Sequence, residues 1–420
     1  MSGGHFHVHG EGVDPQEVPT GRRARVVLLG FLAVAAVATI IALFHLWPNS
    51  QTADLAGHDA QFAAPGVTFP HATITRVLPP CPGGSPREGT QPGTGTCGVV
   101  KATVTTGAHR GDKASVQTYG PIGQAGLTRG DGVQLMSIPQ PPGAPSGSAY
   151  SFFGIDRLVP LAWMAGFFIL IVLLVARLRG LMALLGLAFA GWIVVKFMLP
   201  ALLSGRSGMA VALVGAAAIM FVVLYLAHGP SVRTSTALAG TLIGIGITAL
   251  VAHLEVHANR LSGAGDETGA ILSSLVGHLN FQGLLSCAII VAGLGVLNDV
   301  TITQSTAVWE LRSAAPELSR RRLFGSAMRI GRDHIASTIY TIVFAYAGAA
   351  LSVLLVLYLY QRPILDLLGT EDIAAEVVRT LASSIGLILA VPITTAIATL
   401  TVASTPTPRQ HPDSPYYKPG

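Results

Sequence analysis

Residues 283–310 read GLLSCAIIVAGLGVLNDVTITQSTAVWE, an apolar run that becomes polar towards its end. The first part of this run, up to Asn298, belongs to an uncharged stretch that begins at Thr268. A helix of about 20 mostly apolar residues crosses the hydrocarbon of a bilayer, where each unpaired backbone amide costs several kcal/mol. The stretch is therefore long enough to cross a membrane as a helix, and the same pattern recurs along most of the chain.

The composition of the whole chain predicts a membrane protein. Of its 420 residues, 50% are hydrophobic and 11% are charged, against roughly 25% charged in an ordinary soluble domain. This composition excludes a water-exposed globular enzyme. The formal charge of +5 is too small and too scattered to predict a nucleic-acid partner. Three cysteines are too few for a disulfide scaffold or a four-cysteine zinc module.

Long stretches without Asp, Glu, Lys or Arg predict an α-helical protein with eight transmembrane helices. Seven of these stretches are Val26–Ala53, Leu158–Ala176, Ser207–Val232, Thr234–Leu254, Thr268–Asn298, His334–Gln361 and Thr380–Pro408. The eighth, Leu181–Pro200, contains Lys196 near one end, where the side chain can snorkel to the interface. The first stretch follows Arg22, Arg23 and Arg25 but exceeds the 7 to 15 residues of a signal-peptide core, so it predicts an uncleaved anchor.

The distribution of arginine predicts that both termini are cytoplasmic, because short cytoplasmic loops are enriched in Lys and Arg. A cytoplasmic N-terminus places on the same side Arg22, Arg23, Arg25, Arg177, Arg179, Arg233, Arg312, Arg320, Arg321, Arg322, Arg329 and Arg332. The short external loops then hold Arg206, Arg260, Arg362 and Arg379. The expected domains are a disordered cytoplasmic tail (1–25), an anchor (26–47), an extracytoplasmic β domain (49–156), a seven-helix membrane domain (158–402) and a second disordered cytoplasmic tail (403–420).

The segment from Asn49 to Asp156 is rich in Pro, Gly, Thr and Val and predicts a small barrel-like or sandwich-like β domain. Strand-like runs occupy Ala72–Leu78, Gly98–Thr105, Ala114–Tyr119 and Gly132–Ile138. Cys81 and Cys97 flank a loop rich in Pro and Gly within this domain. The oxidising external side favours a disulfide between them, and two free thiols are the alternative.

One face of the helix quoted first is small and polar. At 100° per residue, one side of this helix carries Ala288, Ala292, Gly295, Asp299, Thr303, Thr306 and Glu310. Ile290, Leu297 and Val308 lie on the opposite side. A carboxylate within a span costs at least about 2.5 kcal/mol, so it is expected to face water or the protein interior. Asp299 is therefore predicted either to hold a cation or proton or to pair with an arginine such as Arg332.

The next helix carries a comparable stripe, which comprises His334, Thr338, Thr341, Ala345, Gly348 and Ser352. We expect the two helices to form a polar substrate or ion site from Asn298, Asp299, Thr303, Gln304, Glu310, His334 and Thr338. Close packing of two small-residue faces is the alternative. Structural roles are expected for Arg332, Asp333 and Pro392, since Pro392 removes a backbone donor and predicts a kink.

A serine motif and an arginine cluster were considered for other functions. The Gly205 to Gly208 run is similar to the G-x-S-G of intramembrane serine proteases, with Ser207 as nucleophile and His278 as base. A short external loop would place Ser207 at the surface, so no enzyme activity is expected. The arginines at Arg320, Arg321 and Arg322 predict binding to anionic lipid head groups. No residue pattern predicts a metal site or a cofactor.

Three motifs in one order resemble the YibE/F family of bacterial multi-pass membrane proteins. They are the run from Gly295 to Glu310, Ile330-Gly331-Arg332-Asp333 with the run from Phe344 to Gly348, and the run from Ser384 to Thr394. The likeness covers roughly residues 72–401. It implies a bacterial plasma (inner) membrane protein with one span, an external β domain and then seven spans, but it implies no particular activity.

The residues favour a transporter or channel-like protein, with a cation- or proton-coupled site at Asp299. Its expected partners are the lipid bilayer, an unknown small solute or ion, and further copies of the chain in a homo-oligomer. The alternative is an envelope scaffold or receptor whose external β domain binds a partner while the spans serve as anchors.

Overall fold

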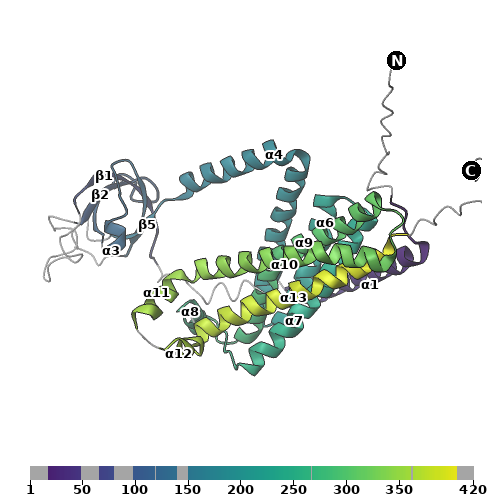
Figure 1. Ribbon diagram of the computed structural model, residues 1–420. Helices are drawn as coiled ribbons and strands as arrows, with labels where there is room; N and C mark the ends of the chain where they lie inside the picture. Colours follow the sequence, from purple (N-terminus) through teal and green to yellow (C-terminus); the bar gives the residue numbers. More distant parts are fainter. Residues whose placement is uncertain are drawn as a thin grey trace, which may run out of the picture. The chain divides into compact units, whose positions relative to one another are not determined.

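The computed structural model describes residues 18–48, 66–79, 98–118, 120–139, 150–265, 267–360 and 363–403. The chain divides into two compact units, and each is described by itself. One unit comprises Gln61–Val175, and the other comprises Met1–Ala60 with Ala176–Gly420. Figure 1 shows the strands of the first unit and the helices of the second.

The smaller unit contains a five-stranded antiparallel sheet in the order β3-β2-β1-β4-β5. Its strands are β1 (His71–Val77), β2 (Val99–Val104), β3 (Lys113–Gln117), β4 (Gly132–Ser137) and β5 (Tyr150–Ile155), with a short helix α3 (Gly120–Gly123) between β3 and β4. Four strands lie where the alternating pattern predicts them. The fifth was not predicted, because it follows a long segment rich in Pro, Gly and Ser.

The sheet buries one face and curls towards closure. Ile74, Val133 and Leu135 are fully buried on the inner face, as expected when alternate residues of a strand point to opposite sides. The outer strands approach each other, since the Tyr150 hydroxyl donates to Asp112 Oδ2 at 3.2 Å. A curled sheet of this kind agrees with the expected barrel-like domain. The predicted disulfide partners Cys81 and Cys97 lie outside the described residues.

The larger unit is helical. Its elements are α1 (Arg22–Leu46), the part of α4 (Leu158–Ile193) that follows Val175, η2 (Val194–Met198), α5 (Leu199–Leu203), α6 (Gly208–His228), α7 (Val232–Ala258), α8 (Glu267–Leu275), α9 (Phe281–Ala314), α10 (Arg320–Ala349), α11 (Leu351–Leu359), α12 (Ile364–Leu368) and α13 (Glu371–Thr401). Within this unit α7, α9 and α13 pack against one another, with α6 and α10 alongside (Figure 1).

Among the described residues, six helices are long and apolar enough to cross a membrane, or seven if a bent pair is counted as one span. The bent pair is α10 with α11, which meet at 64°. The difference from the eight expected spans arises because Leu158–Leu203 forms one helical stretch of 46 residues. Its backbone is non-helical at Arg177, where φ is 51° and ψ is −132°.

Two helix boundaries differ from the ends of the uncharged stretches. The uncharged stretch that begins at Thr268 is divided into α8 and α9, because Asn280 caps α9 by accepting from the backbone N–H of Gly283 at 2.8 Å. Residues 283–310 accordingly lie within α9. The next helix starts at Arg320 and not at His334. Its charged first half is ordered because Leu323 and Ala327 are buried against Trp309.

Glycines set the close packing of α7 against α13. A Cβ added at Gly240 would overlap Thr394, and one added at Gly386 would overlap Thr248. Gly244 faces Leu297 and Ala390 in the same way. The Gly240-x-x-x-Gly244 motif is therefore a helix-packing motif, as small residues at this spacing usually are.

Helix ends that were predicted to share one side of the membrane lie together. At one end, Val18, Trp309, Leu323 and Val402 form a cluster, and the Gly21 N–H donates to the Thr401 carbonyl at 2.9 Å. The beginning of α1 and the end of α13 accordingly meet in Figure 1. A second cluster at the opposite ends of the helices comprises Ala252, Val256, Leu261, Leu285, Ile289, Val378 and Ala382.

Candidate functional site

The small and polar face of α9 lies on the outside of the helical unit. Ala292, Gly295 and Asp299 are exposed, whereas Ile290 and Leu297 on the opposite side are buried. The apolar side of α9 therefore packs against α7 and α13 in the core. Water, lipid or another protein surface must cover the polar face. Within the bilayer, contact between a carboxylate and lipid costs the most free energy of these three.

Asp299 faces His334 of the neighbouring helix α10, and the two side chains form an ion pair when the imidazole is protonated. Asp299 Oδ2 lies 3.6 Å from His334 Nε2. The Asp299 side chain is 66% exposed and the His334 side chain is 28% exposed. The structure thus pairs Asp299 with an imidazole rather than with Arg332, the arginine suggested by the sequence, and Arg332 is exposed.

Two polar atoms at this site are buried without a hydrogen-bond partner among the described residues. They are His334 Nε2 and Asn298 Oδ1. Buried side-chain polar atoms almost always have a partner, so each exception calls for an explanation. His334 Nε2 faces Asp299, and Asn298 precedes Asp299 in the sequence.

The other predicted residues divide between the site and the packing around it. Thr338 is buried, and its hydroxyl donates to the His334 carbonyl at 2.7 Å. Thr303 is half-buried one turn from Asp299. Gln304 is 2% exposed, and its amide donates to the Ala327 carbonyl of α10 at 2.9 Å. Gln304 therefore joins α9 to α10 and does not face Asp299.

Glu310 and Asp333 are exposed, and neither carboxylate is part of the ion pair. Glu310 is eleven residues beyond Asp299, or about 16 Å along the helix. Pro392 lies within α13, which runs as a helix from Glu371 to Thr401. The hydroxyl of Thr395 donates to the Val391 carbonyl at 2.7 Å, next to the proline.

The structure reveals a buried hydroxyl pair that the sequence reasoning missed. Thr241 Oγ1 of α7 and Thr301 Oγ1 of α9 lie 2.7 Å apart, and both residues are fully buried. Thr301 Oγ1 also donates to the Asn298 carbonyl at 3.1 Å. This pair connects the core of the unit to the residue beside Asp299. The feature of the sequence that could have located this pair is a hydroxyl residue, Thr241, within the mostly apolar helix α7.

Ser207 and His278 have backbone partners. Ser207 caps α6 by accepting from the Ala210 N–H at 3.5 Å, and His278 Nε2 lies 3.1 Å from the Leu203 carbonyl. Both side chains are exposed. The serine accordingly has a structural role at the start of α6.

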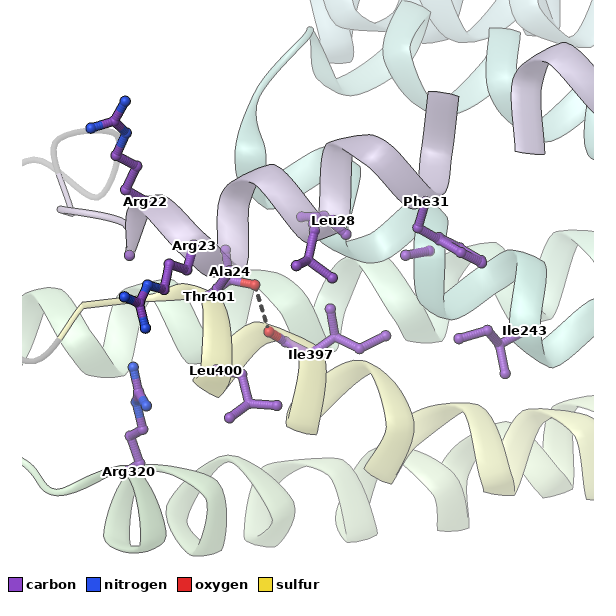
Figure 2. Close-up of a pocket in the computed structure, with 13 residues that line it drawn as sticks. Arg22, Arg23, Ala24, Leu28, Phe31, Ile243, Arg320, Ile397, Leu400 and Thr401 are labelled. Atoms are coloured by element: carbon purple, nitrogen blue, oxygen red, sulfur yellow. Dashed lines mark hydrogen bonds between the residues drawn. The ribbon is translucent and has the colours of Figure 1, made fainter. Parts of the chain in front are cut away.

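The basic side chains predicted to contact lipid lie at the start of α10. Arg320, Arg321 and Arg322 are exposed. Arg320 borders a groove that Arg22 and Arg23 of α1 also line (Figure 2).

The six long apolar helices found among the described residues indicate a multi-pass membrane protein. The family described as YibE/F-like protein matches residues 164–404, which is more than half of the chain. The chain therefore belongs to the YibE/F-like family, in agreement with the resemblance seen in the sequence. No curated protein and no solved structure matches the chain.

Proposed function

We propose that this protein is a transporter or channel-like protein of the bacterial plasma membrane in which Asp299 and His334 form a cation- or proton-coupled site. The observation that carries the proposal is their ion pair, exposed on one side and flanked by the unpartnered Asn298 Oδ1. A carboxylate and an imidazole within hydrogen-bonding reach of water can take up and release a proton. Such pairs mark ion and proton pathways when they occur in transmembrane helices.

The exposed side of the pair supports a pathway on the outer face of the helical unit. The residues that precede Asp299 on this face, Ala292 and Gly295, are small, and a Cβ at Gly295 would meet no atom within 4 Å. A solute could approach the carboxylate along this smooth surface. A second copy of the chain against the same face would enclose the pathway, which accords with the expected homo-oligomer.

Eight spans with both termini cytoplasmic remain part of the proposal. The stretch from Leu158 to Leu203 has 46 residues, which at 1.5 Å per residue is roughly 69 Å. This is about twice the 30 Å thickness of the hydrocarbon. The non-helical backbone at Arg177 lies near its middle, so two spans with Arg177 and Arg179 at a cytoplasmic turn account for the whole stretch.

Proton flux into vesicles tests the proposed site. Purified protein is reconstituted with a pH-sensitive dye inside, and a potassium gradient with valinomycin supplies the driving voltage. The wild type is expected to conduct protons, and Asp299→Asn is expected to abolish the flux. Asp333→Asn is the matched control, since Asp333 is an exposed carboxylate of α10 outside the ion pair.

The result is interpreted by comparison with the Asp333→Asn control and with a second measurement that uses sodium. Equal flux in the wild type and in Asp299→Asn would contradict the proposal. The same measurement with sodium and a sodium-sensitive dye covers a cation that moves without protons. A wild type that moves neither ion would also contradict it, provided that size-exclusion chromatography shows folded protein.

The second candidate function is an envelope scaffold or receptor that acts through the external β domain. The observation that favours it is the separate buried core of the β unit, formed around Ile74, Val133 and Leu135. Deletion of residues 56–146 distinguishes the two functions. A transporter should retain flux in vesicles after the deletion, whereas a scaffold should lose its whole phenotype in cells.

A further inference from the structure

A groove of about 760 Å³ runs beside α1 in the helical unit. Helices α7 and α13 and the first residue of α10 form its other walls. Figure 2 shows Arg22, Arg23 and Arg320 at one end of the groove and Phe31 and Ile243 at the other. Its volume is within the range of ligand-binding clefts in proteins.

The arginine end of the groove is held in place by backbone contacts. The Gly21 N–H donates to the Thr401 carbonyl at 2.9 Å, and the Ala403 N–H donates to the Pro19 carbonyl at 2.7 Å. These contacts attach the first turn of α1 to the end of α13. Arg22 and Arg23 are therefore positioned near Arg320 of α10, and no acidic residue is among the described residues that line the groove.

The remainder of the groove is apolar. Val27 and Phe31 of α1 are 72% and 45% exposed, and Leu400 of α13 is 55% exposed. Ile243 and the small residue Ala239 contribute from α7. An elongated apolar surface that begins at three cations matches a molecule with an anionic head and a hydrocarbon tail.

We propose that this groove binds one anionic phospholipid. Its phosphate contacts Arg22, Arg23 and Arg320, and one acyl chain lies along Val27, Phe31 and Ile243. A lipid with no net charge would be attracted less strongly by the three guanidinium groups. Free phosphate would bind the arginines but would leave the apolar walls of the groove uncovered. The site is separate from Asp299 and does not depend on the proposed transport function.

Native mass spectrometry of the detergent-solubilised full chain with added phosphatidylglycerol or phosphatidylcholine tests this proposal. The wild type is expected to retain one phosphatidylglycerol in preference to phosphatidylcholine. The Arg22→Gln/Arg23→Gln variant is expected to bind phosphatidylglycerol about 25-fold more weakly, which is about fivefold for each arginine near a head group. Arg25→Gln is the control, because Arg25 is exposed on α1 but does not line the groove.

An uncharged variant separates the apolar contact from the charge. Ile243→Trp fills the groove, so it is expected to reduce phosphatidylglycerol retention while the arginines remain. Equal retention of the two lipids by the wild type would overturn the proposal. It would also be overturned if Arg25→Gln weakened binding as much as the double variant, or if Ile243→Trp left retention unchanged. The melting temperature of each variant establishes that it is folded.

Discussion

The packing of α7 against α13 leads to a prediction with a matched control on the same helix. In Gly240→Ala, the new Cβ would overlap the hydroxyl of Thr394 and would lie 2.9 Å from the Thr394 Cβ. Rotation of the Thr394 side chain can move its hydroxyl but not its Cβ, so the two helices must separate. In Gly246→Ala, the new Cβ meets no atom within 4 Å.

The expected free energies follow from these contacts. Overpacking a close-packed interface typically costs about 1–3 kcal/mol. Replacing an uncrowded helical glycine by alanine gains up to about 1 kcal/mol of helix stability. The two variants should therefore differ in their free energy of unfolding by roughly 2–4 kcal/mol, with Gly240→Ala the less stable.

Unfolding in mixed micelles by titration with sodium dodecyl sulfate, followed by circular dichroism, measures this difference. Adding Thr394→Ala to Gly240→Ala should recover part of the loss, because it removes the nearest overlapping atom. The Thr394 hydroxyl has no hydrogen-bond partner among the described residues, so Thr394→Ala alone should cost little. Equal stability of Gly240→Ala and Gly246→Ala would refute the close approach of α7 to α13.

Two further predictions concern other parts of the chain. Gln304→Met removes the hydrogen bond from the Gln304 amide to the Ala327 carbonyl and should destabilise the α9–α10 contact by about 0.5–1.5 kcal/mol in the same titration, whereas exposed Glu310→Gln should have little effect. Burial, followed by the charge of Asp112 and the hydrogen bond to it, raises the pKa of Tyr150. The resulting stability is present below the ordinary pKa of about 10 and is lost as pH rises through the folded-state pKa. The melting temperature of the β unit in the full chain should therefore fall at alkaline pH less steeply for Tyr150→Phe than for the wild type, and parallel curves would contradict this.

Much of the fold could be predicted because it depends on local periodicity. Alternating residues located β1 to β4, and uncharged runs located the apolar helices. The helix boundaries that uncharged runs do not mark depend on tertiary contacts. The charged half of α10 is helical because Leu323 and Ala327 pack against Trp309, and an apolar run alone gives no indication of that contact.

The direction of the polar face of α9 could not be predicted for a related reason. In water, the apolar side of a helix is known to face inwards, but in a bilayer both sides can be apolar. The buried hydroxyls of Thr241 and Thr301 show that this unit also places polar groups inside. The sequence could identify Asp299 and His334 as candidates, but their pairing and the exposure of Asp299 required the structure.

Access of water to Asp299 is the most direct test of the account. A chain with Cys81→Ser, Cys97→Ser and Cys287→Ala receives Asp299→Cys, and its labelling by a membrane-impermeant thiol reagent is measured in intact and inverted vesicles. Ile290→Cys in the same background is the control, because Ile290 is buried in the core of the same helix. The proposed pathway predicts labelling at position 299 from at least one side and none at position 290. Absence of labelling at position 299 from both sides would contradict the central claim.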